Sequence, residues 1–449
     1  MKIGFLPLYL QFYRDVCPVY DAKVEAFAKL IANKLRALGC QLIAAPVCAR
    51  HDEFDAALRQ IKAGGAEVLI TLHLAYSPSL ESVEALAQAN LPIIMLDTTP
   101  DFEYPVDHST LMTNHGIHGV QDLANRLRRL HVPYKVVAGH WSESNVLQKT
   151  LETAQAAAVA NAFRHSRVGR LGGDFRGMGD FLLSEQAMRD NGITVVHFDR
   201  NKHAVMPAEA EIAQEIAALK AIPLADEANE DIYRANAVSS LMVRHFLEKE
   251  NLSSFTFNFM DAHETGVPTT PFVEACNVMT RRLGYAGEGD VLDAAWIGAL
   301  MQATEKTTFT EMFCPDWKAD LIYVSHMGEV NPTLLANPAL RTKASSYLPT
   351  PAPFTFTGAL KPGKVTVANL APAPDDTLEL ITCEGEILPF PEDQNLQISG
   401  FFRPTMSIAK FLASYSQLGG THHSALCYDM PSSFWEDLAL FLGITHHRL

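Results

Sequence analysis

The chain begins with short apolar runs that alternate with amphipathic stretches, and this alternation constrains its fold more than any other feature. Helix-like sequence, such as residues 22–38 and 54–63, separates the runs. The strand-like runs themselves are residues 2–6, 41–46, 68–72, 92–96 and 134–138. Because strands that alternate with helices are typical of a parallel sheet covered by helices, we expect an α/β domain at the N-terminus.

Two changes of sequence character divide the rest of the chain. An alanine-rich helix predicted over residues 144–163 leads into new strands at 167–171 and 194–198, where a second α/β region starts. Beyond about residue 315, strand-like runs are broken by prolines, as in PTPAPF and APAPDD. This texture indicates mostly antiparallel β structure. We therefore predict three domains, with the bounds 1–165, 166–315 and 316–449.

The charge and the cysteines narrow the class of function. A formal net charge of −15 repels nucleic acid and anionic membrane surfaces, so we expect neither as a partner and favour a small neutral substrate. The seven cysteines are scattered and form no CxxC pair, as is usual in a reducing cytosol. The first residues lack the pattern of a signal peptide, and no run of about 18 apolar residues predicts a membrane helix. We expect a cytoplasmic protein.

Two glycine-rich segments allow more than one interpretation. RLGGDFRGMGD, residues 170–180, follows a predicted strand and is either a loop that approaches a ligand closely or a tight turn. GALKPGKV, residues 358–365, nearly matches a phosphate-binding loop, but Val365 has no hydroxyl group and Pro362 has no backbone donor. We interpret the second segment as a turn between strands.

Histidines and glutamates recur in segments of unusual composition. NHGIHG, SHMGEV and GGTHHSA carry the histidines, and Glu288 in AGEGD and Glu311 in TFTEMF lie among small or apolar neighbours, where an unpaired charge is costly. A single histidine is more often structural than a ligand. The THH at His446 and His447 lacks a preceding Gly-Gly, and we expect it to lie in a solvated tail.

Two carboxylates and two imidazoles together form a mixed oxygen and nitrogen set that suits manganese, cobalt or magnesium. Four protein ligands leave two positions of an octahedral ion open, and adjacent sugar oxygens O1 and O2 could fill them. Such an ion polarises a carbonyl, while a nearby carboxylate moves a proton between C1 and C2.

Four motifs, in this order over residues 284–429, resemble the L-arabinose isomerase family: GYAGEGD followed by VLDAAWIGALMQ, then TTFTEMF, VSHMGEVNP and GGTHHSALCYD. Upstream, NHGIHGVQDL and FNFMDAH are similar to substrate-binding segments of that family. The resemblance implies two tandem Rossmann-like α/β domains followed by a β-rich, barrel-like C-terminal domain. It also implies a hexamer whose active sites lie between subunits.

The resemblance further implies a metal-dependent sugar isomerase, an intramolecular oxidoreductase that interconverts an aldose and its ketose. Glu288, Glu311, His326 and His423 would bind the metal, most simply manganese, and the two glutamates would also act as acid and base through an enediol. His423 is chosen over its neighbour because the family uses the second histidine of its HH pair.

Substrate contacts are implied at His118 and Phe259, with Tyr13 added from the N-terminal segment. The remaining positions expected to line the substrate site are His115, Phe175, Met312 and His422. Met312 stands where typical members have an acidic residue, and His115 stands where they have glutamine. The resemblance implies a pentose or related sugar in a conversion of the L-arabinose to L-ribulose type, and these departures leave another pentose or a deoxysugar open as the substrate. The sister L-fucose isomerase group shares the architecture.

Three other functions stay open. A non-enzymatic sugar-binding or sensor protein could share the tandem α/β pattern, and a metallohydrolase could use the same ion to activate water. A nicotinamide-dependent dehydrogenase ranks low because LPLYLQ, not GxGxxG, follows the first strand.

Overall fold

The computed structural model describes residues 1–449 except 104–107, 345–347, 349–350 and 392–396. The chain divides into two units, each with its own core. Unit 1 contains Met1–Asn161 and Ser432–Gly443, and unit 2 contains Ala162–Pro431 and Ile444–Leu449. The division into three domains at residues 165 and 315 stays a prediction.

Unit 1 is built on a parallel five-stranded sheet in the order β2-β1-β3-β4-β5. Its strands are β1 (Lys2–Leu8), β2 (Gln41–Ala44), β3 (Val68–His73), β4 (Ile93–Asp97) and β5 (Tyr134–Ala138). The strand β3 is buried along its whole length, as expected for a parallel sheet that is covered on both faces. This strand order is that of doubly wound α/β folds, in which ligands bind beyond the carboxyl ends of the strands.

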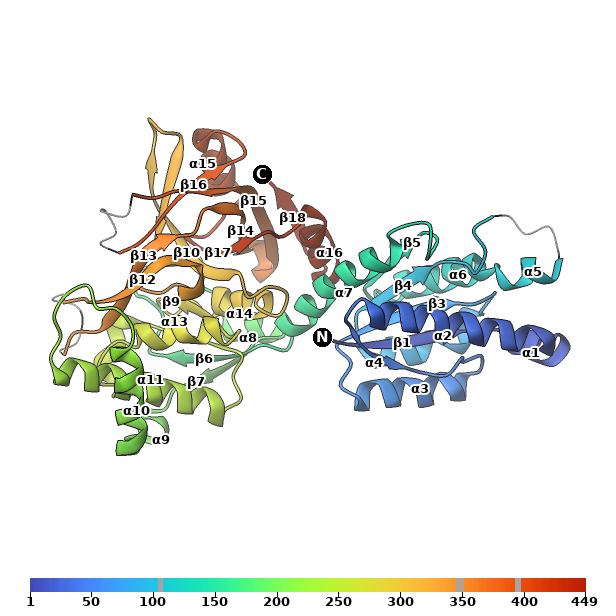
Figure 1. Ribbon diagram of the computed structural model, residues 1–449, viewed down its shortest axis with the longest axis horizontal. Helices are drawn as coiled ribbons and strands as arrows, with labels where there is room; N and C mark the ends of the chain where they lie inside the picture. The colour runs from blue at the N-terminus through green and yellow to red at the C-terminus, as the bar shows by residue number, and fades with distance from the viewer. Residues whose placement is uncertain (104–107, 345–347, 349–350, 392–396) are drawn as a thin grey trace. The chain divides into compact units, whose positions relative to one another are not determined.

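Helices cover the sheet of unit 1 (Figure 1). One core cluster joins the apolar faces of three of them to β1, β3 and β4, through residues such as Phe54, Leu86 and Leu123. The helical segments of the unit are α1 (Gln11–Val16), η1 (Pro18–Tyr20), α2 (Asp21–Ala37), α3 (His51–Ala63), η2 (Ser79–Glu81), α4 (Val83–Ala89), α5 (His108–Thr113), α6 (Gly116–Arg129), α7 (Val146–Phe163) and α16 (Ser432–Leu442).

The helix α16 returns to unit 1 from near the end of the chain. Its buried Asp437 accepts a hydrogen bond from Thr153 of α7 at 2.6 Å and forms an ion pair with Lys135 of β5 at 3.0 Å. These contacts fix a C-terminal segment on an N-terminal sheet.

Unit 2 contains a second parallel sheet, in the order β7-β6-β8-β9. Its strands are β6 (Arg167–Leu171), β7 (Thr194–His197), β8 (Ser254–Phe257) and β9 (Gly284–Gly287). The helical segments that accompany them are α8 (Glu185–Asp190), α9 (Arg200–His203), α10 (Glu209–Lys220), α11 (Glu230–Lys249), η3 (Phe259–Asp261), α12 (Ala262–Thr265), α13 (Phe272–Thr280) and α14 (Val291–Leu300).

The C-terminal strands of unit 2 form a nine-stranded sheet that closes on itself. The pairing β16-β11-β10-β17-β14-β15 is antiparallel throughout, and β15 pairs again with β16, so these strands complete a barrel. The elements of this region are β10 (Thr307–Asp316), β11 (Leu321–Ser325), η4 (Pro332–Leu334), β12 (Leu335–Thr342), β13 (Phe354–Leu360), β14 (Gly363–Pro372), η5 (Pro374–Asp376), β15 (Leu378–Leu388), β16 (Ile398–Pro404), α15 (Ile408–Gln417), β17 (His423–Tyr428) and β18 (Thr445–Arg448). Two parallel α/β sheets followed by a barrel confirm the predicted fold class.

The helix α14 joins the parallel sheet of unit 2 to the barrel. It contacts β8 and β9 on one side and β10, β14 and β17 on the other, and all ten of its residues are buried. Trp296 of this helix donates a hydrogen bond from Nε1 to the carbonyl of Ala368 in β14 at 3.1 Å. The apolar sequence VLDAAWIGAL therefore forms a core helix, and its N-terminus is held where the two layers meet.

The C-terminal histidines and the helix lengths bear on two further expectations. His446 and His447 do not form a solvated tail: they lie in β18, paired with β15, and His447 Nε2 is 2.8 Å from Glu379 Oε2. Among the helices in the described part of the chain, none is both long and apolar enough to cross a membrane.

Candidate functional site

The parallel sheet of unit 2 presents three predicted site elements at the carboxyl ends of its strands. The glycine-rich loop follows β6, Phe259 follows β8, and Glu288 follows β9. Asn258 fixes the start of the loop, because its side-chain amide donates to the carbonyls of Gly173 and Asp174, each at 3.2 Å. The loop RLGGDFRGMGD is thus held at the edge where α/β folds bind ligands.

Glu288 adopts a left-handed backbone conformation that residues other than glycine rarely take. Its φ is 62°, and Gly289 follows with a φ of 86°. The backbone N–H of Glu288 donates to the carbonyl of Phe257 at 3.0 Å, and Asp290 then caps α14 by accepting from the N–H of Asp293 at 2.9 Å. Backbone strain of this kind persists where the surrounding structure enforces it, and it concentrates at functional sites.

Three neighbouring barrel strands supply the other predicted ligands. Glu311 of β10 stands opposite His423 of β17 on one side and opposite Ser325 of β11 on the other, and His326 follows directly after Ser325. Because opposed residues of paired strands project from the same face, the register brings Glu311 and His423 together from segments that are far apart in the sequence.

Among the described residues, a carboxylate and two imidazoles lie close enough together to share a metal ion. One ligand atom from each of Glu288, His422 and His423 lies within 4.8 Å of the other two. The Oε2 atom of Glu288 is 3.5 Å from His422 Nε2 and 3.8 Å from His423 Nε2. The group contains two of the four expected ligands, together with His422, which was expected as a substrate contact. Glu311 and His326 lie outside it.

A buried carboxylate fixes the orientation of His423. The Oδ2 atom of Asp290 is 3.0 Å from His423 Nδ1, and the imidazole is completely buried. The other ring nitrogen, Nε2, is buried without a hydrogen-bond partner. Burial holds the pKa of His423 well below its usual value, which favours the neutral ring. In the tautomer that donates from Nδ1 to Asp290, Nε2 keeps its lone pair. This orphaned nitrogen suits a metal ligand.

His326 lies in the loop after β11 and is supported in the same way by a carboxylate three residues further along the chain. Its Nδ1 is 2.7 Å from Glu329 Oε2, and Tyr285 donates its hydroxyl hydrogen to the other carboxylate oxygen at 2.9 Å. Burial opposes protonation of His326, but Glu329 and its hydrogen bond raise the pKa above the usual value. Gly287 is required beside this ring, because a Cβ there would lie 2.8 Å from His326 Cε1.

The pKa values of the two predicted catalytic carboxylates are shifted in opposite directions. Burial raises the pKa of Glu311, and the nearby His326 and His422 only partly offset it. Burial also opposes ionisation of Glu288, yet the hydrogen bond from His422 and the fields of His423 and His326 hold its pKa below the usual value. Carboxyl groups whose pKa values move in opposite directions are suited to act as an acid and a base.

His422 is a strongly held cation. Burial disfavours its charged form, but hydrogen bonds to Asp180 and Glu288 raise its pKa to about 10. Burial opposes ionisation of Asp180 as well, and its hydrogen bonds with His422 lower its pKa to about 2. The two side chains are 2.7 Å apart and form an ion pair beside Glu288.

Aromatic rings enclose the histidines. Phe181 stacks on His423 with 5.3 Å between ring centroids and 11° between planes, and Phe309 lies 4.8 Å from His423 and 4.7 Å from His326. The predicted substrate contacts Phe175 and Phe259 pack edge to face at 5.6 Å. These rings exclude water from one side of the cluster, which strengthens its electrostatic interactions.

Met312 lies next to Glu311 but on the other face of β10. Successive residues of a strand point to opposite faces, and Met312 pairs with Val324 just before the register shifts at a bulge. Its expected substrate contact stays a prediction.

The predicted substrate contacts Tyr13, His115 and His118 belong to unit 1. The rings of His115 and His118 are 4.1 Å apart and Tyr76 packs against both. The hydroxyl of the buried Tyr13 is 4.0 Å from the sulfur of Met112, in the helix before His115. The three residues stay predicted substrate contacts.

Sequence reasoning missed several residues that support the site. Asp290 lies inside the motif GYAGEGD, and Asp180 ends the glycine-rich segment, so both lay within segments that were singled out. Nothing in the sequence links them to the histidines 133 and 242 residues away. Tyr285, Phe181 and Phe309 look like ordinary core residues in the sequence.

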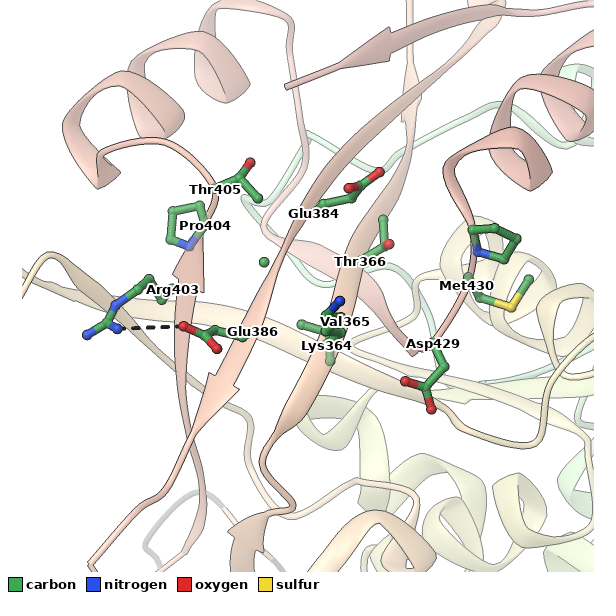
Figure 2. A pocket seen from close by; sticks show the side chains of 12 residues that line it. Lys364, Val365, Thr366, Glu384, Glu386, Arg403, Pro404, Thr405, Asp429 and Met430 are labelled. Carbon is green, nitrogen blue, oxygen red and sulfur yellow. Dashed lines mark ion pairs between the residues drawn. The ribbon is translucent and has the colours of Figure 1, made fainter.

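A separate cavity of about 660 Å³ is lined by residues of β14, β15 and β16 and of the segments that follow β16 and β17 (Figure 2). It contains none of the predicted site residues. Its charged side chains are largely paired with each other or with neighbours, as Arg403 is with Glu386 at 3.6 Å and Glu384 is with Arg448 at 3.1 Å. The cluster at Glu288 has the better chemistry for catalysis.

Known families match both ends of the chain. The L-arabinose isomerase N-terminal domain matches residues 19–165, and the L-arabinose isomerase C-terminal domain matches residues 306–445. Together these segments make up more than half of the chain.

Individual proteins match over nearly the whole length. L-arabinose isomerase 1 of Bacillus licheniformis is 25% identical over 94% of this chain and 89% of its own length. The L-arabinose isomerase of Shouchella clausii is 23% identical over 98% of this chain and 92% of its own length. A solved periplasmic solute-binding protein of Actinobacillus succinogenes with bound D-allose shares 14% identity over 68% of this chain and 92% of its own, with a TM-score of 0.18 that is too low to bear on fold or function.

Proposed function

Because the chain belongs to the L-arabinose isomerase family, we propose that it is a metal-dependent sugar isomerase that interconverts an aldose and its ketose. The reaction is an intramolecular oxidoreduction. The observation that carries this proposal is the pair formed by Glu288 and the buried, unpartnered Nε2 of His423, 3.8 Å apart beside Glu311.

Glu288, Glu311, His326 and His423 are the proposed metal ligands. Asp290 and Glu329 each bind the Nδ1 side of a histidine, which leaves the Nε2 nitrogens of His423 and His326 for the ion. Two carboxylates and two imidazoles suit manganese, with cobalt or magnesium as alternatives. When bound, the ion would polarise the sugar carbonyl and stabilise negative charge on the adjacent oxygens.

Glu288 and Glu311 serve as the acid and the base. One of the two carboxylates accepts the proton from the carbon next to the carbonyl and returns it to the other carbon, and the second exchanges a proton with the sugar hydroxyl. The route passes through an enediol. Phe181 and Phe309 restrict water at the histidines, which protects such an intermediate from side reactions.

The substrate is a neutral pentose or a related sugar such as a deoxysugar. The name of the relatives suggests L-arabinose, but Met312 and His115 replace residue types that are typical of the family. Phe175, Phe259 and His422 are the proposed contacts in unit 2, and Tyr13, His115 and His118 are those in unit 1.

A homo-oligomer, most simply a hexamer, is the proposed assembly. The seven cysteines are all unpaired, which supports a cytoplasmic location. Light scattering after gel filtration measures the assembly.

The first test is the conversion of a panel of aldopentoses and deoxyhexoses by the manganese-loaded protein, followed by chromatography and mass spectrometry. We expect a product with the same mass as the substrate. Glu311→Gln is expected to lower turnover at least ~100-fold, a typical loss for a general acid or base, and Glu305→Gln, which changes an exposed carboxylate, is the control. Two products whose masses add up to that of the substrate plus one water would indicate a hydrolase, and sugar binding without conversion would indicate a binding protein.

A further inference from the structure

Asp180, at the end of the glycine-rich loop, binds His422 at two points. Its Oδ2 atom accepts a hydrogen bond from the backbone N–H of His422 at 2.9 Å and lies 2.7 Å from Nδ1 of the same residue. One oxygen thus fixes both the backbone and the ring of His422. These two contacts join segments that are 242 residues apart in the sequence.

The contact of Asp180 with Nδ1 fixes the orientation of the imidazole ring of His422. With Nδ1 turned to Asp180, the other ring nitrogen, Nε2, lies 3.5 Å from Glu288 Oε2. His422 therefore stands between two carboxylates, and its direction depends on Asp180.

Asp180 also fixes the far end of the loop, residues 172–180. The near end is held by Asn258 and by Asp261, whose carboxylate accepts from the N–H of Gly173 at 2.9 Å. Between the two ends, Arg176 forms an ion pair with Asp261 at 3.8 Å, but its side chain is 82% exposed, and a Cβ at Gly177 would touch nothing within 4 Å. The loop is thus anchored at its ends, and its middle is exposed.

The loop carries apolar rings to both sides of this anchor. Phe175 packs on Phe259, and Phe181, the residue after Asp180, stacks on His423. The contact of Asp180 with His422 lies between these two rings in the sequence.

We propose that Asp180 is a positioning residue that anchors the glycine-rich loop on His422, so that the loop and this imidazole together form the sugar-facing wall of the site. This inference rests on the proposed isomerase function and adds a residue to it. Asp180 acts through His422, which in turn faces Glu288 and the bound sugar.

The kinetic test compares Asp180→Ala with wild type and with Glu185→Ala. Glu185 is the matched control because it also pairs with a histidine, His197 at 2.9 Å, but on the exposed helix α8 outside the loop. Asp180→Ala is expected to raise KM for the sugar about tenfold while kcat falls less than threefold, because a binding wall contributes to ground state and transition state alike. Manganese affinity should stay within about twofold, and Asp180→Glu should restore part of the lost KM.

A second readout needs no substrate. Trypsin cleavage after Arg176 is expected to be at least about fivefold faster in Asp180→Ala than in wild type and Glu185→Ala, because the loop loses its far anchor. Should wild type convert no sugar, the isomerase proposal fails while this readout still tests the anchor. The inference is overturned if Asp180→Ala has the same KM and the same cleavage rate as wild type. It is also overturned if the variant loses metal affinity, kcat and folded structure to the same extent.

Discussion

The Oδ2 atom of Asp290 lies 3.0 Å from Nδ1 of His423, and this contact leaves Nε2 of the same ring buried, unpartnered and 3.8 Å from Glu288. An imidazole held in this way is prepared to bind a metal, because its lone pair points to the carboxylate that would share the ion. The pairing of Asp290 with His423 therefore links the capping of α14 to the proposed chemistry.

Asp290→Asn tests this link directly. Asparagine caps helices as well as aspartate does, so α14 should keep its N-terminus. An amide holds the imidazole less firmly and lowers its basicity, and we expect manganese to bind 10- to 100-fold more weakly, on the order found for such outer partners of metal ligands. Titration calorimetry measures the affinity. Asp190→Asn, on the surface of α8, is the control, and equal affinities in all three proteins would refute the role of Asp290.

Gly287→Ala tests the space beside the other supported histidine. The added methyl carbon would lie 2.8 Å from His326 Cε1, so the ring must move away from Glu329 or from the ion. We expect kcat to fall at least ~10-fold, since displacements of about 1 Å can cost a factor of 10². Gly363→Ala is the control, because a Cβ there meets only ordinary contacts at 3.4 Å or more. Unchanged kinetics in Gly287→Ala would show that His326 does not need its position.

His73 makes the stability of unit 1 depend on pH. Burial lowers its pKa to about 3, against 6.5 in the unfolded chain, so the folded state binds fewer protons between these values. Stability is then fully present above about pH 6.5 and is lost as the pH falls toward 3, by at most about 1.4 kcal/mol per pH unit. In His73→Asn this contribution is absent.

The measurement is urea unfolding of wild type and His73→Asn at several values between pH 7 and 5. As the pH is lowered from 7 to 5, the free energy of unfolding of wild type should decrease more steeply than that of the variant. Parallel curves would contradict the buried neutral state of His73.

The fold was predictable where local pattern determines it. Continuous apolar runs such as VLITLH predict buried parallel strands, and the structure confirms both parallel sheets. The closure of the barrel through the pairing of β15 with β16 could not be predicted from the sequence, because antiparallel strands can pair with partners that are far away in the sequence. The packing of α16 in unit 1 could not be predicted either, because the sequence of an amphipathic helix does not show which sheet the helix covers.

The candidate site was predictable to the extent that its residues lie in recognisable motifs. Glu288 and His423 were expected together and lie 3.8 Å apart. The residues that orient them were not expected, because a carboxylate such as Asp180 or Asp290 looks the same in the sequence whether it faces solvent or an imidazole. The position of Glu311 opposite His423 depends on the register of β10 with β17, which the sequence does not show.

The most direct test of the central claim is removal and return of the metal. The protein is stripped with a chelator, its metal content is checked by mass spectrometry, and aldose–ketose interconversion is followed before and after manganese is restored. A metal-dependent isomerase shows no interconversion after stripping and recovers it with manganese, with a product of unchanged mass. Interconversion at the original rate by verified metal-free protein would contradict the proposed metal dependence.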